Sequence, residues 1–166
     1  MVRKYILVLM RGLEMRKSHG FTLIELILVM ALLGILLAVL IPNLYPFLDG
    51  IVLKTEAQKI ALVIQQTQQL AKLSGEYHFF EIHTSEKFYR IRNFEGTVIK
   101  EEINSRIHKI TSNFPGYSGG DANLKILTFT STGTPGGRTG NIQLFLKSGK
   151  SSTVHVAAVT GRVRIE

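Results

Sequence analysis

The sequence contains no cysteine, so the chain forms neither a disulfide framework nor a thiolate metal site. Its stability must therefore come from packing. Acidic residues are also few, 12 against 20 lysines and arginines, and they are scattered along the chain. No serine, histidine and carboxylate occur together in a recognised nucleophile motif. We therefore predict that the chain is not an enzyme and needs no cofactor.

A metal site is equally unsupported by the sequence. His78 and His83 are an odd number of residues apart in one predicted strand, so they should face opposite sides, and neither has a nearby acid-rich cluster. Gly149-Lys150-Ser151 resembles the end of a phosphate-binding loop, but Leu144 stands where that motif needs its first glycine. We predict no metal and interpret the triplet as a hairpin turn.

Apolar residues concentrate between Phe21 and Ile41, whereas the sequence after Asp49 has the mixed composition of a water-soluble domain. The run has about the twenty residues that a helix needs to cross a hydrocarbon core, and its one charge is Glu25. A chain of 166 residues has room for one domain with a real core. We therefore predict a transmembrane helix over 21–41 followed by one soluble head.

Five of the lysines and arginines lie before Gly20, against one glutamate, so half of the net charge of +8 belongs to this short segment. A basic segment before a membrane helix predicts a single-pass inner-membrane protein with its N-terminus in the cytoplasm and its head in the periplasm or outside the cell. A secretory signal peptide has similar chemistry. However, the apolar run is about twice the length of a signal core, and no A-x-A-like pair of small residues borders it.

Lys17-Ser18-His19-Gly20 followed by Phe21-Thr22-Leu23-Ile24-Glu25 resembles the processing motif of type IV prepilins and pseudopilins. The resemblance implies cleavage after Gly20 by a prepilin peptidase, N-methylation of Phe21, and a role for Glu25 in assembly with other pilins or pseudopilins. A lone carboxylate at mid-membrane costs about 2.5 to 3.5 kcal/mol, and the α-amino group of a neighbouring subunit would compensate it. The alternative is an ordinary membrane anchor with a stray glutamate.

Residues 1–20 form the predicted cleaved cytoplasmic leader, which contains its own apolar patch from Tyr5 to Met10. Met15 is a second candidate start, and translation from it would give a leader of residues 15–20. The sequence does not decide between Met1 and Met15.

Beyond Pro42, apolar residues recur at three- and four-residue steps, which predicts an amphipathic continuation of the helix over 42–75 that ends near Gly75. Pro42 should bend this helix without ending it. From Tyr77 the period changes to two, which predicts a β-rich head over 76–166. The predicted fold is α+β and pilin-like, with a long N-terminal helix packed on antiparallel strands. These strands are expected over 77–84, 87–93, 97–103, 107–112, 125–130, 141–147, 152–158 and 162–165.

The chain closes with Gly161-Arg162-Val163-Arg164, where strand alternation places both arginines on one face. Two adjacent guanidinium groups suit phosphates, and Arg138, Lys147 and Lys150 would extend the basic patch if the hairpin before the last strand folds back beside it. The stretch from Phe129 to Arg164 resembles the GspH/FimT branch of pseudopilins. This resemblance implies binding of double-stranded DNA during natural transformation. Alternatively, the arginines guard the solvated face of an edge strand.

Two functions follow from these patterns. The first is a structural subunit, a minor pseudopilin or pilin placed at or near the tip of a type II secretion pseudopilus or a type IV pilus. The second is a FimT-like minor pilin that binds DNA. The two filament systems share this architecture, so the sequence does not distinguish them.

Overall fold

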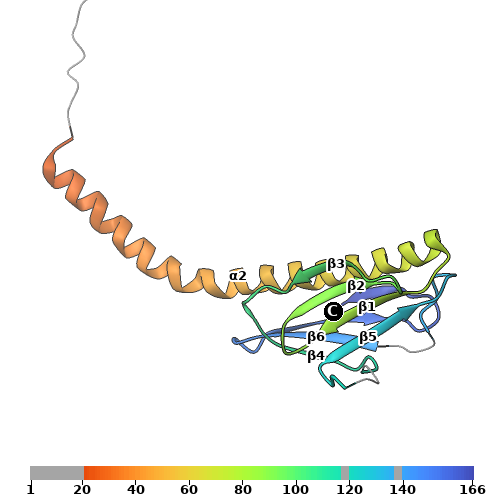
Figure 1. The fold of residues 1–166 in the computed structure, drawn as a ribbon. Helices are drawn as coiled ribbons and strands as arrows, with labels where there is room; N and C mark the ends of the chain where they lie inside the picture. The colour runs from red at the N-terminus through yellow and green to blue at the C-terminus, as the bar shows by residue number, and fades with distance from the viewer. Residues whose placement is uncertain (1–20, 117–119, 137–139) are drawn as a thin grey trace, which may run out of the picture. The chain divides into compact units, whose positions relative to one another are not determined.

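The computed structural model describes residues 21–116, 120–136 and 140–166. The chain divides into two compact units, one up to Pro42 and one from Asn43 to Glu166. A helix, α2 (Leu23–Ser74), contributes residues to both units, and the strands all belong to the second (Figure 1). The strands are β1 (His78–His83), β2 (Phe88–Arg92), β3 (Thr97–Glu102), β4 (Ile107–Ser112), β5 (Leu124–Phe129), β6 (Gly140–Leu146), β7 (Ser151–Val156) and β8 (Val163–Ile165).

Helix α2 is 52 residues long and ends at Ser74, next to Gly75 with its left-handed φ of 69°. Glycine adopts this conformation without a steric penalty and is the usual residue after a helix end. The predicted end near Gly75 is therefore confirmed. The helix also continues through Pro42 and Pro46, which confirms that Pro42 does not end it. The bend at Pro42 stays a prediction.

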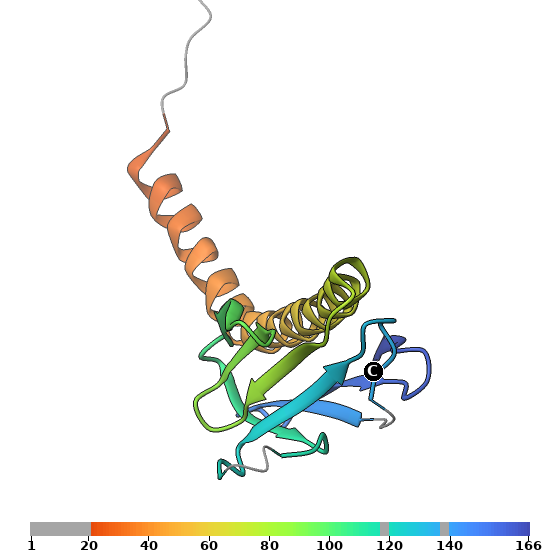
Figure 2. The same cartoon turned by 45° about the vertical axis from the view of Figure 1, so that its right-hand side comes forward.

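The strands form two antiparallel four-stranded sheets. Sheet A has the order β3-β2-β1-β5, and sheet B has the order β4-β6-β7-β8. Strands β1 and β5, which are far apart in the sequence, lie side by side with His78 opposite Phe129 (Figure 2). In sheet B, β6 lies between β4 and β7, and β8 is an edge strand.

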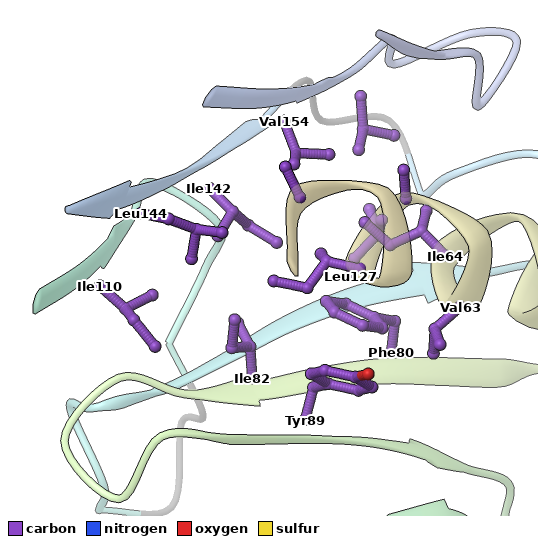
Figure 3. Packing of buried hydrophobic residues seen from close by; sticks show 14 of the residues in the cluster. Val63, Ile64, Phe80, Ile82, Tyr89, Ile110, Leu127, Ile142, Leu144 and Val154 are labelled. Atoms are coloured by element: carbon purple, nitrogen blue, oxygen red, sulfur yellow. The ribbon is translucent and has the colours of Figure 1, made fainter. Parts of the chain in front are cut away.

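One hydrophobic core joins the second half of α2 to both sheets (Figure 3). Ile64 of α2 is fully buried, as are Phe80 of sheet A and Ile142 of sheet B. Within β6 and β7, buried residues alternate with half-exposed ones, because one face of sheet B packs on the core. The core therefore fixes both sheets against the helix without any disulfide.

Each of the eight predicted strands is present, and the observed bounds agree with the predicted ones to within two residues. The fold is α+β, with a long N-terminal helix and an antiparallel β-rich head, as the sequence predicts.

Candidate functional site

The apolar start of α2 is the first candidate site. Thr22 precedes the helix, and its hydroxyl oxygen accepts a hydrogen bond from the backbone N–H of Glu25 at 3.3 Å. This contact is a helix N-cap, and it satisfies one of the donors that a helix start leaves unpaired. Glu25 lies in the first turn, where the positive end of the helix dipole favours a carboxylate. The local sequence therefore both begins the helix and places one acid at its start.

From Leu23 to Ile41 this helix is long and apolar enough to cross a membrane, with a mean hydropathy of 3.0 over its most apolar stretch. Its side chains are exposed around the whole helix, and Phe21 before it is 79% exposed. Among the residues that the structure describes, the carboxylate of Glu25 has no hydrogen bond or ion pair. Gly20, the predicted cleavage position, lies outside the described residues.

The C-terminal arginines form the second candidate site. Gly161, with a left-handed φ of 66°, closes a tight turn in which its N–H donates to the carbonyl of Ala157 at 2.9 Å. The turn directs the chain back along β7, so that Arg164 pairs with His155. Arg162 and Arg164 are both exposed and line the same groove of about 470 Å³. The predicted placement of both arginines on one face of the strand agrees with this arrangement.

The rest of the groove combines polar and apolar residues with one acid, Glu166. Asn113 accepts a hydrogen bond from the N–H of Asn141 at 2.6 Å, which ties the end of β4 to the start of β6. His155 lies 3.5 Å from the carboxylate of Glu166. The other lining residues are Gly140, Val156 and Ala157. The groove therefore offers two guanidinium groups for an anion and one carboxylate that partly offsets them.

The other predicted cations do not join this groove. Lys147 and Lys150 lie at the turn between β6 and β7, at the opposite end of these strands from Arg164. Lys150 donates instead to the carbonyl of Pro46 at 2.7 Å, and Lys147 lines a different hollow. The hairpin lies beside β8, but its turn is at the other end of β7 from the arginines, so these two lysines do not line the arginine groove. Arg138 lies outside the described residues.

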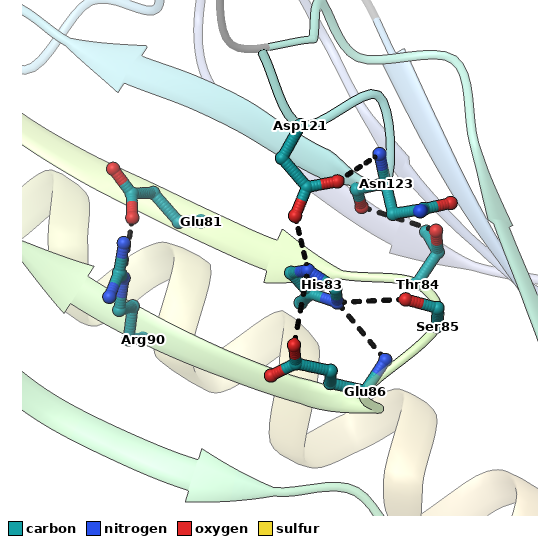
Figure 4. A network of polar contacts seen from close by, with 8 residues as sticks. All are labelled: Glu81, His83, Thr84, Ser85, Glu86, Arg90, Asp121 and Asn123. Carbon is teal, nitrogen blue, oxygen red and sulfur yellow. Dashed lines mark hydrogen bonds and ion pairs between the residues drawn. The ribbon is translucent and has the colours of Figure 1, made fainter. Parts of the chain in front are cut away.

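A polar cluster around His83 was not predicted from the sequence (Figure 4). The imidazole Nε2 lies 2.6 Å from Asp121 and 3.8 Å from Glu86, so two carboxylates lie beside His83. Nδ1 accepts the backbone N–H of Glu86 at 3.0 Å, so Nε2 carries the proton of the neutral ring and donates it to Asp121. Ser85 Oγ is 3.2 Å from Nδ1.

The order Asp121, His83, Ser85 resembles that of a serine-hydrolase triad, but its chemistry differs. The lone pair that would take the serine proton already accepts the N–H of Glu86. The His83 ring also stacks on Phe88, with ring centroids 5.2 Å apart. We assign the cluster a structural role, in which His83 fastens the Asp121 loop to the β1–β2 turn.

Two further carboxylates are buried in the head. Glu81 is 1% exposed and accepts hydrogen bonds from Arg90 at 2.5 Å and from Arg92 at 2.8 Å on the neighbouring strand. Glu56 of α2 is 2% exposed and pairs with Lys59 at 3.0 Å. In the described part of the chain, no group of three or more histidines and acids is arranged to hold a metal ion.

Comparison with known proteins finds one match for the N-terminal segment and several for the fold of the chain. Residues 15–41 match the prokaryotic N-terminal methylation motif. The type IV minor pilin FimU of Pseudomonas aeruginosa, in its P21 crystal form, has the same fold, with a TM-score of 0.57 over 72% of this chain and 92% of that one. The chain thus carries the N-terminal methylation motif on a pilin-like fold. Sequence identity to FimU is 14%, so that comparison establishes only the pilin-like fold of the head. The methylation motif is a separate match, and it covers the N-terminal segment.

Two more solved structures resemble the pilin-like chain. FimU in its P65 crystal form gives a TM-score of 0.52 at 14% identity over 69% of this chain and 92% of that one. The minor pseudopilin EpsH from the type 2 secretion system of Vibrio cholerae gives 0.51 at 14% identity over 69% of this chain and 95% of that one. No curated protein sequence matches the chain significantly. The pilin-like protein thus has the fold of minor pilins and minor pseudopilins.

Proposed function

We propose that this protein is a non-enzymatic minor pilin or minor pseudopilin that is cleaved after Gly20, methylated at Phe21 and assembled into a filament through the apolar half of α2. The observation that carries this proposal is an exposed 19-residue apolar helix with a single carboxylate in its first turn, which lies within the stretch 15–41 that matches the methylation motif. An exposed apolar surface of this length requires a membrane or neighbouring helices to cover it.

In the proposed assembly step, Glu25 supplies the counter-charge for the α-amino group of a neighbouring subunit. Cleavage creates an α-amino group at Phe21, and a charged amine and a charged carboxylate are each costly in hydrocarbon. When one subunit's amine docks beside a neighbour's Glu25, two isolated charges become one compensated pair. Before assembly, the same helix would anchor the subunit in the inner membrane, with its head on the periplasmic or outer side. A place at or near the filament tip is part of the proposal, because the solved relatives are minor pilins and pseudopilins.

Cleavage is tested by co-expression with a prepilin peptidase. The wild-type chain should shorten by its leader, and Gly20→Ile should block this because a branched side chain obstructs the approach of the protease to the backbone. Gly34→Ile is the matched control, because a Cβ at Gly34 meets nothing within 4 Å and the position lies inside the apolar helix. Equal cleavage of Gly20→Ile and wild type would contradict the proposal.

Assembly is tested separately with Glu25→Ala. The variant should be cleaved normally but should be lost from sheared filaments, because the neighbour's amine has no counter-charge. Glu25→Asp keeps the charge and should assemble better than Glu25→Ala. Incorporation of Glu25→Ala at wild-type levels would show that the helix is an ordinary anchor.

A second candidate function is binding of double-stranded DNA at the arginine groove. Its support is that Arg162 and Arg164 are exposed and line one groove, and that the Gly161-to-Arg164 segment resembles the GspH/FimT ending. Against it stand Glu166 in the same groove and the position of β8 at a sheet edge, where charges also prevent aggregation.

A head that lacks residues 1–48 tests this second function, since its core begins at Leu53. The slope of log affinity against log salt should fall by about one unit for each arginine replaced by glutamine. Arg106→Gln, which changes an exposed arginine outside the groove, is the control. Unchanged DNA binding in Arg162→Gln/Arg164→Gln would exclude the groove. Genes for secretion or for competence beside this gene would separate the pseudopilus from the DNA-uptake pilus.

A further inference from the structure

Strand β8 leaves part of its backbone unpaired. Glu166 and Thr153 exchange both backbone hydrogen bonds, at 2.7 and 2.8 Å, and Arg162 accepts the N–H of Ala157 at 3.0 Å. In an antiparallel pair, every second residue bonds to the partner strand, and the residues that alternate with these point their N–H and C=O groups away from it. Val163 and Ile165 are these residues. Within the described part of the chain, no further strand pairs with the free edge of β8.

A neutral groove lies directly beside this free edge. It has a volume of about 520 Å³, and β8 forms one wall while α2 forms the other. Leu62 of α2 is 63% exposed and Ile165 is 37% exposed, although large apolar side chains in a folded head are usually covered. The lining residues are Gln58, Ala61, Leu62, Gln65, Val163 and Ile165. None of them is charged.

The charges of β8 lie on its other face. Arg162 and Arg164 line the groove described above as the second candidate site, whereas Val163 and Ile165 face α2. A strand added beside β8 would therefore meet apolar surface on its inner face and two guanidinium groups near its outer face. A complementary strand would therefore carry apolar side chains on its inner face and acidic side chains on its outer face.

We propose that β8 and the adjacent groove bind an extended segment of another protein chain as a fifth strand of sheet B. The bound segment runs antiparallel to β8, carries apolar residues facing Leu62 and Ile165, and carries acidic residues between them. Its apolar residues lie opposite Val163 and Ile165, so their N–H and C=O groups are the ones that complete the ladder. An added helix cannot satisfy these backbone groups, so an occupant that pairs with the free edge must be extended.

The test uses the full chain in phosphatidylcholine nanodiscs and a fluorescent peptide of sequence Glu-Val-Glu-Ile-Glu-Val-Glu as the probe. Binding is measured by anisotropy, and hydrogen exchange of residues 157–166 is followed by mass spectrometry. We expect saturable binding and slower exchange of this segment. N-methylation of the Val and Ile residues of the peptide should abolish binding, whereas N-methylation of the inner Glu residues should leave it within about twofold. If N-methylation of the Glu residues weakened binding more than N-methylation of Val and Ile, or if both weakened it equally, antiparallel strand addition would be overturned.

Protein variants separate this site from the DNA candidate. Leu62→Gln and Ile165→Gln should each weaken peptide binding at least tenfold while leaving DNA binding unchanged. Leu73→Gln is the control, because Leu73 is 85% exposed on the same helix but outside the groove. Arg162→Glu/Arg164→Glu should reverse the preference toward a peptide with lysine in place of glutamate. Equal affinity of all variants, or protection that appears through self-association without peptide, would contradict the proposal.

Discussion

The hydrogen bond between His83 and Asp121 joins residues 38 positions apart and holds a loop against the β1–β2 turn. The pKa of Asp121 is held below its ordinary value, first by the N–H of Asn123 and then by His83. Because the folded-state pKa is lowered, this carboxylate stabilises the fold above its unfolded pKa of about 3.9. The stabilisation is lost as the pH falls through the folded-state pKa.

We therefore expect Asp121→Asn to lower the melting temperature at pH 7, with a difference from wild type that shrinks as the pH falls below about 4. Circular dichroism melts between pH 7 and pH 2.5 measure this difference. Glu95→Gln, an exposed acid at the turn before β3, serves as the control. If the difference in melting temperature between Asp121→Asn and wild type stayed constant with pH, the loss of stability would come from packing alone.

Glu81 supports a second prediction, because its buried carboxylate joins Arg90 and Arg92 across two strands. Glu81→Ala leaves two partly buried guanidinium groups without their counter-charge. We expect a loss of about 3 kcal/mol in the free energy of unfolding, measured by urea denaturation. Glu76→Ala removes an exposed acid just before β1 and should change stability by less than about 0.5 kcal/mol. Similar costs for both variants would refute this role.

Single residues also show how far sequence reasoning reaches. The shared face of Arg162 and Arg164 could be predicted because strand alternation is local. The His83–Asp121 contact could not, because Asp121 comes from a loop before β5 and meets His83 only through the register of β1 with β5. Lys147 and Lys150 lie away from the arginines because β8 runs antiparallel to β7, which places the arginines beside the end of β7 and leaves the two lysines before its start.

At the scale of elements, Gly140 at the start of β6 lies against an aromatic ring. A Cβ at this position would come 2.0 Å from Phe114 Cε1, and Phe114 is 2% exposed and cannot move away freely. We expect Gly140→Ala to destabilise the head by about 1 to 3 kcal/mol through overpacking. Thermal unfolding of the two variants checks this, with Gly136→Ala as the control because its Cβ would have ordinary contacts at 3.8 Å. An unchanged melting temperature for Gly140→Ala would show that the ring can shift.

The strands themselves could be predicted closely from the sequence, since a period of two with turn residues between the runs marks each one. Their arrangement in sheets could not. Strand β1 pairs with β5 as well as with β2, and β4 pairs with β6. Such long-range pairings depend on which faces the shared core buries, and local patterns do not contain that information.

For the whole molecule, the core residues run from Leu53 to Val156 and all lie in the second compact unit. We expect a chain that lacks residues 1–48 to unfold cooperatively, with a melting temperature within a few degrees of the full chain in nanodiscs. The contact of Lys150 with Pro46 is lost in this chain, and it is a single exposed hydrogen bond. A molten head, with far-ultraviolet but no near-ultraviolet circular dichroism, would contradict this expectation.

The division of strands between the sheets has a consequence for how the head folds. Sheet A takes β5, which follows β4 in the chain, and sheet B takes β4, which precedes β5. Sheet A therefore stays incomplete until the chain has emerged past β4, and β4 must wait for β6 before it gains a partner. No single cut in the polypeptide separates the two sheets, because a cut before β4 parts β5 from the rest of sheet A and a cut after β5 parts β4 from the rest of sheet B. The head should consequently fold late, as one cooperative body, after most of its strands have been synthesised.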